Sequence, residues 1–340
     1  MAESANALSQ NPVYLARPMA ILLLAFAGWN IVTFYFIQGS LEPVVSAMRL
    51  LIEGLIAYAL IRWFPKAPER IMQAVLVLSS VSSLIVFIQI LEEAQILPTP
   101  FRWIMTDFWH LYSEATRKTG LLNNFQVSSF LGFLSVVLLI NRKKATSVAL
   151  TVINSFSVLF GARTLCLLWP FLLMVNRRAL IAMILVLSTM FMAGTPRLQR
   201  LLTYHFDVRL MPAVQVVATG DFKQDYSSKD TLSQYKAPHD IKTFWLGNGI
   251  PRYSEGGGFD PVASRWLLQA GLPAMILALA LSFLVIVKIG LKPGMKNKVF
   301  AAALLLLMVK EEMITSTLGF PLLLLYGFAP PEADENAAEG

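Results

Sequence analysis

Residues 245–273 read WLGNGIPRYSEGGGFDPVASRWLLQAGLP, and they join a glycine-rich, charged segment directly to the start of an apolar helix. The glycines allow the backbone to adopt positive φ angles and to approach a ligand closely. The arginines and carboxylates of the segment place both signs of charge beside hydrocarbon. Such charges cost free energy and usually mark a functional site. The stretch therefore predicts chemistry at a membrane surface and an apolar helix that enters the membrane.

The remainder of the chain has the composition of a membrane protein. Of its 340 residues, 56% are hydrophobic and 14% are charged, and the mean hydropathy is +0.60. These values lie outside the range of soluble domains. A bilayer core about 30 Å thick requires roughly 20 apolar residues per helix, so we predict an all-α polytopic membrane protein with about ten transmembrane helices. The predicted spans are residues 18–37, 43–63, 71–91, 126–141, 145–160, 163–176, 179–194, 265–289, 297–310 and 313–328.

These spans divide the chain into successive regions. The predicted regions are a cytoplasmic N-terminus at 1–17, transmembrane helices 1–7 at 18–194 with an outward loop at 92–125, a large periplasmic loop at 195–264, transmembrane helices 8–10 at 265–328, and a disordered cytoplasmic tail at 329–340. Near-helical apolar spacing after residue 195 predicts short helices within the large loop. The N-terminus lacks the pattern of a cleaved signal, so the first span is expected to remain in the membrane.

The short loops determine the expected orientation, because lysine and arginine are retained in the cytoplasm. Basic residues cluster in every second loop: Arg17 before the first span; Arg62, Lys66 and Arg70 after the second; Arg142, Lys143 and Lys144 after the fourth; Arg177 and Arg178 after the sixth; and Lys288, Lys292, Lys296 and Lys298 after the eighth. Both termini are therefore predicted in the cytoplasm, and both long loops outside. The net charge of +7 mainly reflects this bias, so nucleic acid is not an expected partner.

Single residues narrow the chemistry further. Cys166 is the only cysteine, so a disulfide within the chain and a cysteine-rich metal site are both excluded, and we expect it to be a small buried side chain. Arg163 lies at the predicted outer end of an apolar span, where it either reaches lipid phosphates or helps to form an anion site. Guanidinium suits an anion site because its planar fork binds phosphate oxygens bidentately. The outward arginines that could form such a pocket are Arg163, Arg209, Arg252 and Arg265.

Three motifs resemble those of the bacterial O-antigen polymerase and O-antigen ligase superfamily. Ala-Arg-Thr at 162–164 is similar to the Ser-Arg-Thr-Gly segment of that family, and Arg209 is followed after ten residues by Gly220, as in an Arg-x10-Gly pattern of polymerase loops. LGNGI, Asp260 and SRWLLQAGLPAMIL are similar to the Gly-x-Gly, polar residue, amphipathic helix and Gly-Leu-Pro that end the large loop. Ligases have a histidine at the position that aligns with Asp260, so the resemblance favours a polymerase of the Wzy type. The resemblance as a whole implies a GT-C-like fold.

The resemblance implies a metal-independent glycosyltransferase without a cofactor, in the bacterial inner membrane, whose active site faces the periplasm. Its implied substrate is an undecaprenyl-diphosphate-linked oligosaccharide, and its implied partners are membrane lipid, a chain-length regulator and a flippase. Arg163 and Arg209 are assigned to the donor diphosphate, Arg252 or Arg265 to the second headgroup or to product release, and Asp260 to the general base. Glu255 and His239 are reserves for the base, Asn248 and Tyr253 complete the predicted substrate contacts, and Asp260 also fits a helix N-cap before Pro261.

Two other functions stay open at the level of sequence. An O-antigen ligase would share the fold and the donor but would transfer the glycan to lipid A core. A multi-span transporter would require ionisable residues near the bilayer midplane, for which Glu53, Glu311 and Glu312 are the candidates.

Overall fold

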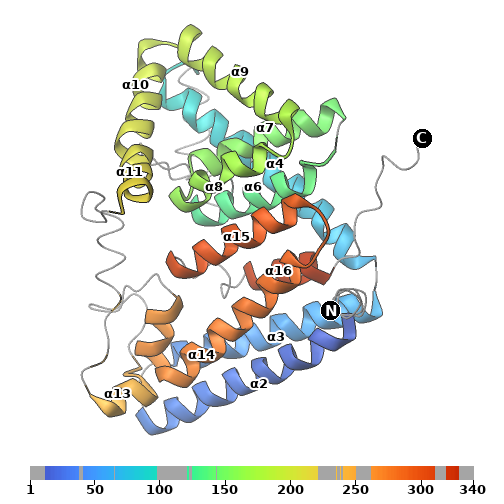
Figure 1. Ribbon diagram of the computed structural model, residues 1–340, viewed down its shortest axis with the longest axis vertical. Helices are drawn as coiled ribbons and strands as arrows, with labels where there is room; N and C mark the ends of the chain where they lie inside the picture. The colour runs from blue at the N-terminus through green and yellow to red at the C-terminus, as the bar shows by residue number, and fades with distance from the viewer. Residues whose placement is uncertain are drawn as a thin grey trace. The chain divides into compact units, whose positions relative to one another are not determined.

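The computed structural model describes residues 12–37, 41–64, 66–97, 121, 125–142, 144–220, 235, 238, 240–249, 262–310 and 319–328. For a few of these residues, Arg163 and Arg209 among them, it describes the backbone alone. Helices joined by short turns make up the described ranges, and these ranges contain no β-strand (Figure 1). The all-α fold class is therefore confirmed for the part of the chain that the structure describes.

The chain forms two compact units that are not consecutive in sequence. The first unit joins residues 1–72 with 226–332 and contains α2 (Pro12–Ile37), α3 (Glu42–Trp63), the start of α4 (Ala67–Glu93), α13 (Ile241–Leu246), α14 (Val262–Gly290), α15 (Met295–Lys310) and α16 (Gly319–Phe328). Within this unit α2 packs against both α3 and α14, and the three helices run side by side (Figure 1). The first two helices of the chain thus complete a bundle with its last helices.

The second unit consists mainly of residues 73–225 and contains the remainder of α4. Its other helices are α6 (Phe125–Leu139), α7 (Ala145–Leu159), α8 (Arg163–Leu173), α9 (Arg177–Ala193), α10 (Pro196–Tyr204), the π-helix η3 (His205–Leu210) and α11 (Met211–Thr219). The short helices expected after residue 195 are therefore present. Thr195 caps the first of them, because its hydroxyl accepts a hydrogen bond of 3.3 Å from the Leu198 amide.

Within the described residues, four helices are long and apolar enough to cross a membrane. They are Pro18–Ile37, Glu42–Trp63, Ala67–Glu93 and Ala263–Gly290, which coincide with four of the predicted spans and are compatible with a membrane protein by length and composition. The helices at the other predicted spans are shorter, from 10 residues in α16 to 17 in α9. A 15-residue helix is about 22 Å long, against about 30 Å of hydrocarbon. The total of ten spans stays a prediction, and the interfacial loop at 92–125 lies largely outside the described residues.

The second unit is held together by a buried polar contact that we call the serine seam: Ser79, Ser80, Ser83, Asn154 and Ser157. The Ser79 hydroxyl donates to Asn154 Oδ1 at 2.5 Å, and Asn154 Nδ2 donates to Ser80 Oγ at 2.9 Å. Ser83 and Ser157 share a hydrogen bond of 2.7 Å. Helices in lipid associate through small residues and interhelical hydrogen bonds, since lipid removes the hydrophobic drive between them. The seam therefore fixes α4 against α7.

Replacing Asn154 by leucine is expected to lower the free energy of unfolding by about 2 kcal/mol, because interhelical hydrogen bonds in membranes contribute roughly 0.6 kcal/mol each and Asn154 makes three to α4. Reversible unfolding in mixed micelles measures the change. Thr189→Val is the control, because the Thr189 hydroxyl bonds only to Leu185 of its own helix, at 2.8 Å on an exposed face. Equal changes for the two variants would show that the seam does not stabilise the unit.

The predicted span at 265–289 is one helix in sequence but two in structure. α14 is interrupted at Ala270 (φ −137°, ψ 15°) and Gly271 (φ 80°, ψ −179°), so the predicted span contains a break that its run of apolar residues does not indicate. The cause is Pro273, which has no amide hydrogen for the carbonyl of Gln269, four residues earlier. Proline is well accommodated in the first turn of a helix, and the helix accordingly restarts just before it.

Candidate functional site

The break in α14 meets the Gly-x-Gly segment that follows α13, and we call this contact the junction: Gly247–Gly249 against Leu268–Gly271. The Asn248 amide donates to the Leu268 carbonyl at 2.7 Å, and the Gly249 amide donates to the Gln269 carbonyl at 3.1 Å. The Ala270 carbonyl accepts from Trp29 Nε1 at 2.8 Å. Carbonyls at the end of the first half of α14 are thus satisfied by a neighbouring segment and by α2, as buried backbone groups require.

Two glycines make so close an approach of backbone to backbone possible. Gly247 (φ 75°, ψ −174°) and Gly271 (φ 80°, ψ −179°) both occupy a region of backbone conformation that is essentially restricted to glycine. A Cβ atom on Gly271 would lie 2.0 Å from the Trp245 carbonyl oxygen, and one on Gly247 would lie 2.5 Å from the Ala270 nitrogen. The positive φ expected for the glycines of the Gly-x-Gly segment is confirmed at Gly247 and Gly249, and Gly271 also has a positive φ.

α13 delivers the Gly-x-Gly segment to the junction. Asp240 is the N-cap of this helix, and its Oδ1 accepts a hydrogen bond of 2.7 Å from the Thr243 amide. That backbone hydrogen bond holds the pKa of the Asp240 carboxyl below its usual value. The helix ends at Gly247, whose amide bonds to the Thr243 carbonyl at 2.8 Å. A short capped helix therefore sets the direction in which the chain enters the junction.

In sequence, residues 250–261 connect the junction with the start of α14. Gly249 is held on the carbonyl of Gln269, and the chain returns at Val262 to begin the same half-helix. Val262 and Gln269 are seven residues apart on α14, which corresponds to roughly 10 Å along the helix axis. Four of the predicted site residues belong to this segment and lie outside the described residues, as does His239: Arg252, Tyr253, Glu255 and Asp260. The same holds for the proposed N-cap of Asp260 with Pro261.

Arg265 lies one turn before the break in α14 and is the best-described of the predicted arginines. Its side chain is buried, and its Nε donates to Gln269 Oε1 at 3.0 Å. One of its terminal nitrogens lies 3.8 Å from Glu42 Oε1 at the start of α3, and its guanidinium lies 5.1 Å from the centre of the Trp266 ring. A buried guanidinium that is held by a carboxylate and an amide is fixed in orientation. Glu42 would compete with a phosphate for it.

Arg163 and Arg209 belong to the second unit, where they start from adjoining elements. Arg163 opens α8, and Arg209 lies in η3, which packs against α8. His205 of η3 is also buried and stacked on Phe160, the C-cap residue of α7, with ring centroids 4.6 Å apart. Single turns of π-helix often occur at functional sites. The structure therefore brings the backbones of these two predicted arginines into one region, while Gly220 of the Arg-x10-Gly pattern ends α11 with a φ of 70°.

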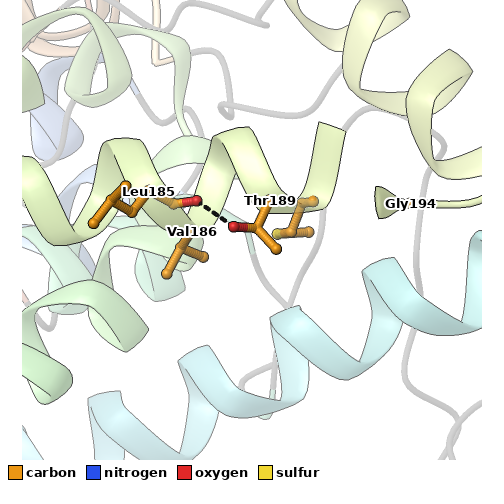
Figure 2. Close-up of a pocket in the computed structure, with 5 residues that line it drawn as sticks. Leu185, Val186, Thr189 and Gly194 are labelled. Carbon is orange, nitrogen blue, oxygen red and sulfur yellow. Dashed lines mark hydrogen bonds between the residues drawn. The ribbon is translucent and has the colours of Figure 1, made fainter. Parts of the chain in front are cut away.

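Two hollows among the described residues do not suit a sugar. The one that borders the junction measures about 10 Å³ and is lined by Asn30, Thr33, Phe34, Ile37, Pro43, Gly249 and Gln269. This volume is too small for a phosphate, so the junction is a packed scaffold. A surface hollow of about 420 Å³ along α9 contains Leu185, Val186, Thr189 and Gly194, and the Thr189 hydroxyl is bonded to the Leu185 carbonyl (Figure 2). Its lining carries no charge. No cluster of three metal-ligating side chains occurs within the described ranges.

Several residues of the site were missed by sequence reasoning. Gln269 could have been found from its spacing of four residues after Arg265, which places both on one helix face. Glu42 and Trp29 carry no such signal, because they reach the junction from helices more than 200 residues away in sequence. The contact expected between Asn248 and substrate stays a prediction, and the structure adds that its backbone amide holds the junction together.

Comparison with known proteins adds no assignment: no protein-family model matches this chain, and a search of the curated proteins finds no match.

Proposed function

We propose that this chain is a membrane glycosyltransferase of the O-antigen polymerase type. It transfers the growing glycan from undecaprenyl diphosphate to the non-reducing end of a new undecaprenyl-diphosphate-linked repeat unit on the periplasmic face. The observation that carries the proposal is the junction, where the Gly-x-Gly part of the resemblance is hydrogen-bonded to Leu268 and Gln269, at the end of the half-helix just before the Gly-Leu-Pro part. In sequence the junction borders the segment that contains Arg252, Glu255 and Asp260, and it lies one helical turn from Arg265.

The proposed reaction is a displacement at C1 of the donor's reducing-end sugar. The acceptor hydroxyl forms the new C1–O bond, the bond from C1 to the diphosphate oxygen breaks, and the hydroxyl proton passes to Asp260. Undecaprenyl diphosphate leaves as an anion and requires charge neutralisation more than protonation, which arginines can provide. Arg163 and Arg209 take this role in the proposal, because their backbones lie on adjoining elements of the second unit. Arg265 orients the second headgroup or helps to release the product.

The charge distribution of the first unit supports the proposed orientation. Met19, Arg62 and Phe328 line one cavity, and Lys288 Nζ lies 5.3 Å from the centre of the Phe328 ring, so the basic ends of α3 and α14 share one end of the unit. Glu42, Arg265 and the junction lie toward the other ends of the same helices. The preference of basic residues for the cytoplasmic side therefore supports a junction on the periplasmic side.

The transporter alternative finds less support. Its candidate Glu53 pairs with Arg49 of the same helix, with 3.1 Å between Arg49 Nε and Glu53 Oε1, so this carboxylate already has a neighbouring counter-charge. Glu311 and Glu312 lie outside the described residues. The ligase alternative shares every feature of the site except a histidine at position 260, and only an experiment on the acceptor separates it from a polymerase.

Electrophoresis of lipopolysaccharide from a deletion strain tests the proposal. Loss of this chain is expected to reduce the O-antigen ladder to lipid A core with one repeat unit, and the wild-type gene is expected to restore the ladder. Core without any repeat unit would instead identify a ligase. An unchanged ladder would show that this chain does not polymerise O-antigen. It would favour a transporter or an enzyme that makes another polymer.

A further inference from the structure

The first unit contains a second candidate binding site, at the end of the bundle away from the junction. A cavity of about 500 Å³ lies between α2, α3 and α16. Its walls are mainly apolar and come from Met19, Leu23, Leu55 and Leu324, while Gly54 contributes no side chain. This volume is within the range of ligand pockets in proteins, which is about 300–1,000 Å³. The cavity therefore suits an extended apolar ligand.

The cavity opens at the surface of the unit. Leu55 and Tyr58, which face it from α3, are 46% and 39% exposed. Trp63, at the same end of α3, is 69% exposed. Aromatic residues with an apolar body and a polar tip are typical of the headgroup level of a bilayer. An acyl chain could thus enter from the surrounding lipid and leave its headgroup beside Tyr58 and Trp63.

The charge around the opening selects the headgroup. Arg62 itself lines the cavity and is exposed at its opening. Lys288 lies over Phe328, a lining residue, and Lys292 donates a hydrogen bond of 2.5 Å to the backbone carbonyl of Tyr326, two residues earlier in α16. Lys66 lies just after α3, and Glu69 is an acidic residue near it in this described part of the chain. Such an excess of basic residues near a membrane surface attracts anionic lipid.

We propose that this cavity binds one anionic glycerophospholipid, with an acyl chain between α2, α3 and α16 and the phosphate against Arg62. The occupant is a lipid of the leaflet at the basic end of the unit. The site is separate from the junction, where Arg265 is paired with Glu42 at the opposite ends of α14 and α3. The lipid links the first helices of the chain to its last helix, and it does not require the proposed glycosyltransferase activity.

Native mass spectrometry of the purified full chain in detergent tests this site, with dioleoylphosphatidylglycerol and dioleoylphosphatidylcholine as probes. The wild-type chain is expected to retain one phosphatidylglycerol in preference to phosphatidylcholine. Arg62→Gln is expected to reduce that preference about fivefold, the effect of one basic residue near a charged surface. Arg70→Gln removes a charge from the same end of the unit without lining the cavity, and it should leave the bound lipid in place.

A second pair of variants tests the cavity itself. Ala20→Phe fills it from α2 and is expected to abolish retention, whereas Ile21→Phe adds the same side chain at a neighbouring position that is 64% exposed and should not change it. If Ala20→Phe does not fold, brominated phosphatidylglycerol provides the test, because its quenching of tryptophan fluorescence should fall in Trp63→Phe. Equal retention of the two lipids by the wild type, or equal effects of Arg62→Gln and Arg70→Gln, would overturn the proposal.

Discussion

Replacing Gly271 by alanine will prevent the first unit from reaching its folded state. The substitution adds a Cβ atom 2.0 Å from the Trp245 carbonyl oxygen and 2.3 Å from its carbonyl carbon, so backbone must move against backbone. It also forces a side chain into a conformation at φ 80° that is strained by about 1–3 kcal/mol. Together these costs exceed about 4 kcal/mol, which is exceptional for a single substitution. The expected observation is aggregated or degraded protein in detergent size-exclusion chromatography.

Two other glycines separate steric overlap from backbone strain as causes of the expected loss of stability. Gly220 has a φ of 70°, but no atom lies within 4 Å of the position that a Cβ atom would occupy, so Gly220→Ala isolates backbone strain and should cost only about 1–2 kcal/mol. Gly28 lies in α2 with open space around it, and Gly28→Ala should leave the thermal midpoint unchanged or slightly raised. A Gly271→Ala variant as stable as Gly220→Ala would show that the junction does not hold the unit together.

Replacing Arg209 by alanine will stop chain extension while the protein remains in the membrane. Loss of one preorganised group that stabilises developing charge lowers the rate about 10²–10³-fold, so the lipopolysaccharide ladder should collapse to core plus one repeat unit. Arg209→Lys should restore part of the ladder, because lysine keeps the charge but loses the bidentate fork. Arg197→Ala is the matched control, since Arg197 is an exposed arginine of the preceding helix α10.

Asp260→Asn in the same strain tests the proposed base by the same readout. It removes the proton acceptor and keeps the size of the side chain, so it should give the same short product with normal protein abundance on immunoblots. A ladder of normal length from Arg209→Ala or from Asp260→Asn would remove that residue from the site. The effect of Gly271→Ala differs, because there the protein itself should be lost.

The comparison of Arg265 with Arg209 shows how far the candidate site could be predicted. Sequence placed both among the outward arginines by residue type and by distance from the apolar runs. It could not show that Arg265 is buried against Glu42 and Gln269, because that pairing depends on α3 packing beside α14. Nor could it show that His205 of η3 stacks on Phe160 at the end of α7, because stacked rings leave no pattern in the spacing of residues.

Local features of the sequence determined the helical, apolar character of this protein and the ends of its four long described helices to within a few residues. They also determined the positive φ of Gly247 and Gly249. These follow from nearest-neighbour chemistry: apolar length, proline without an amide hydrogen, and glycine without a Cβ atom. Only the tertiary structure decided which segment binds the carbonyls beside the break in α14, and which helices form each unit. An unsatisfied carbonyl requires a donor wherever it is buried, but the donor is chosen by packing between segments that are far apart along the chain.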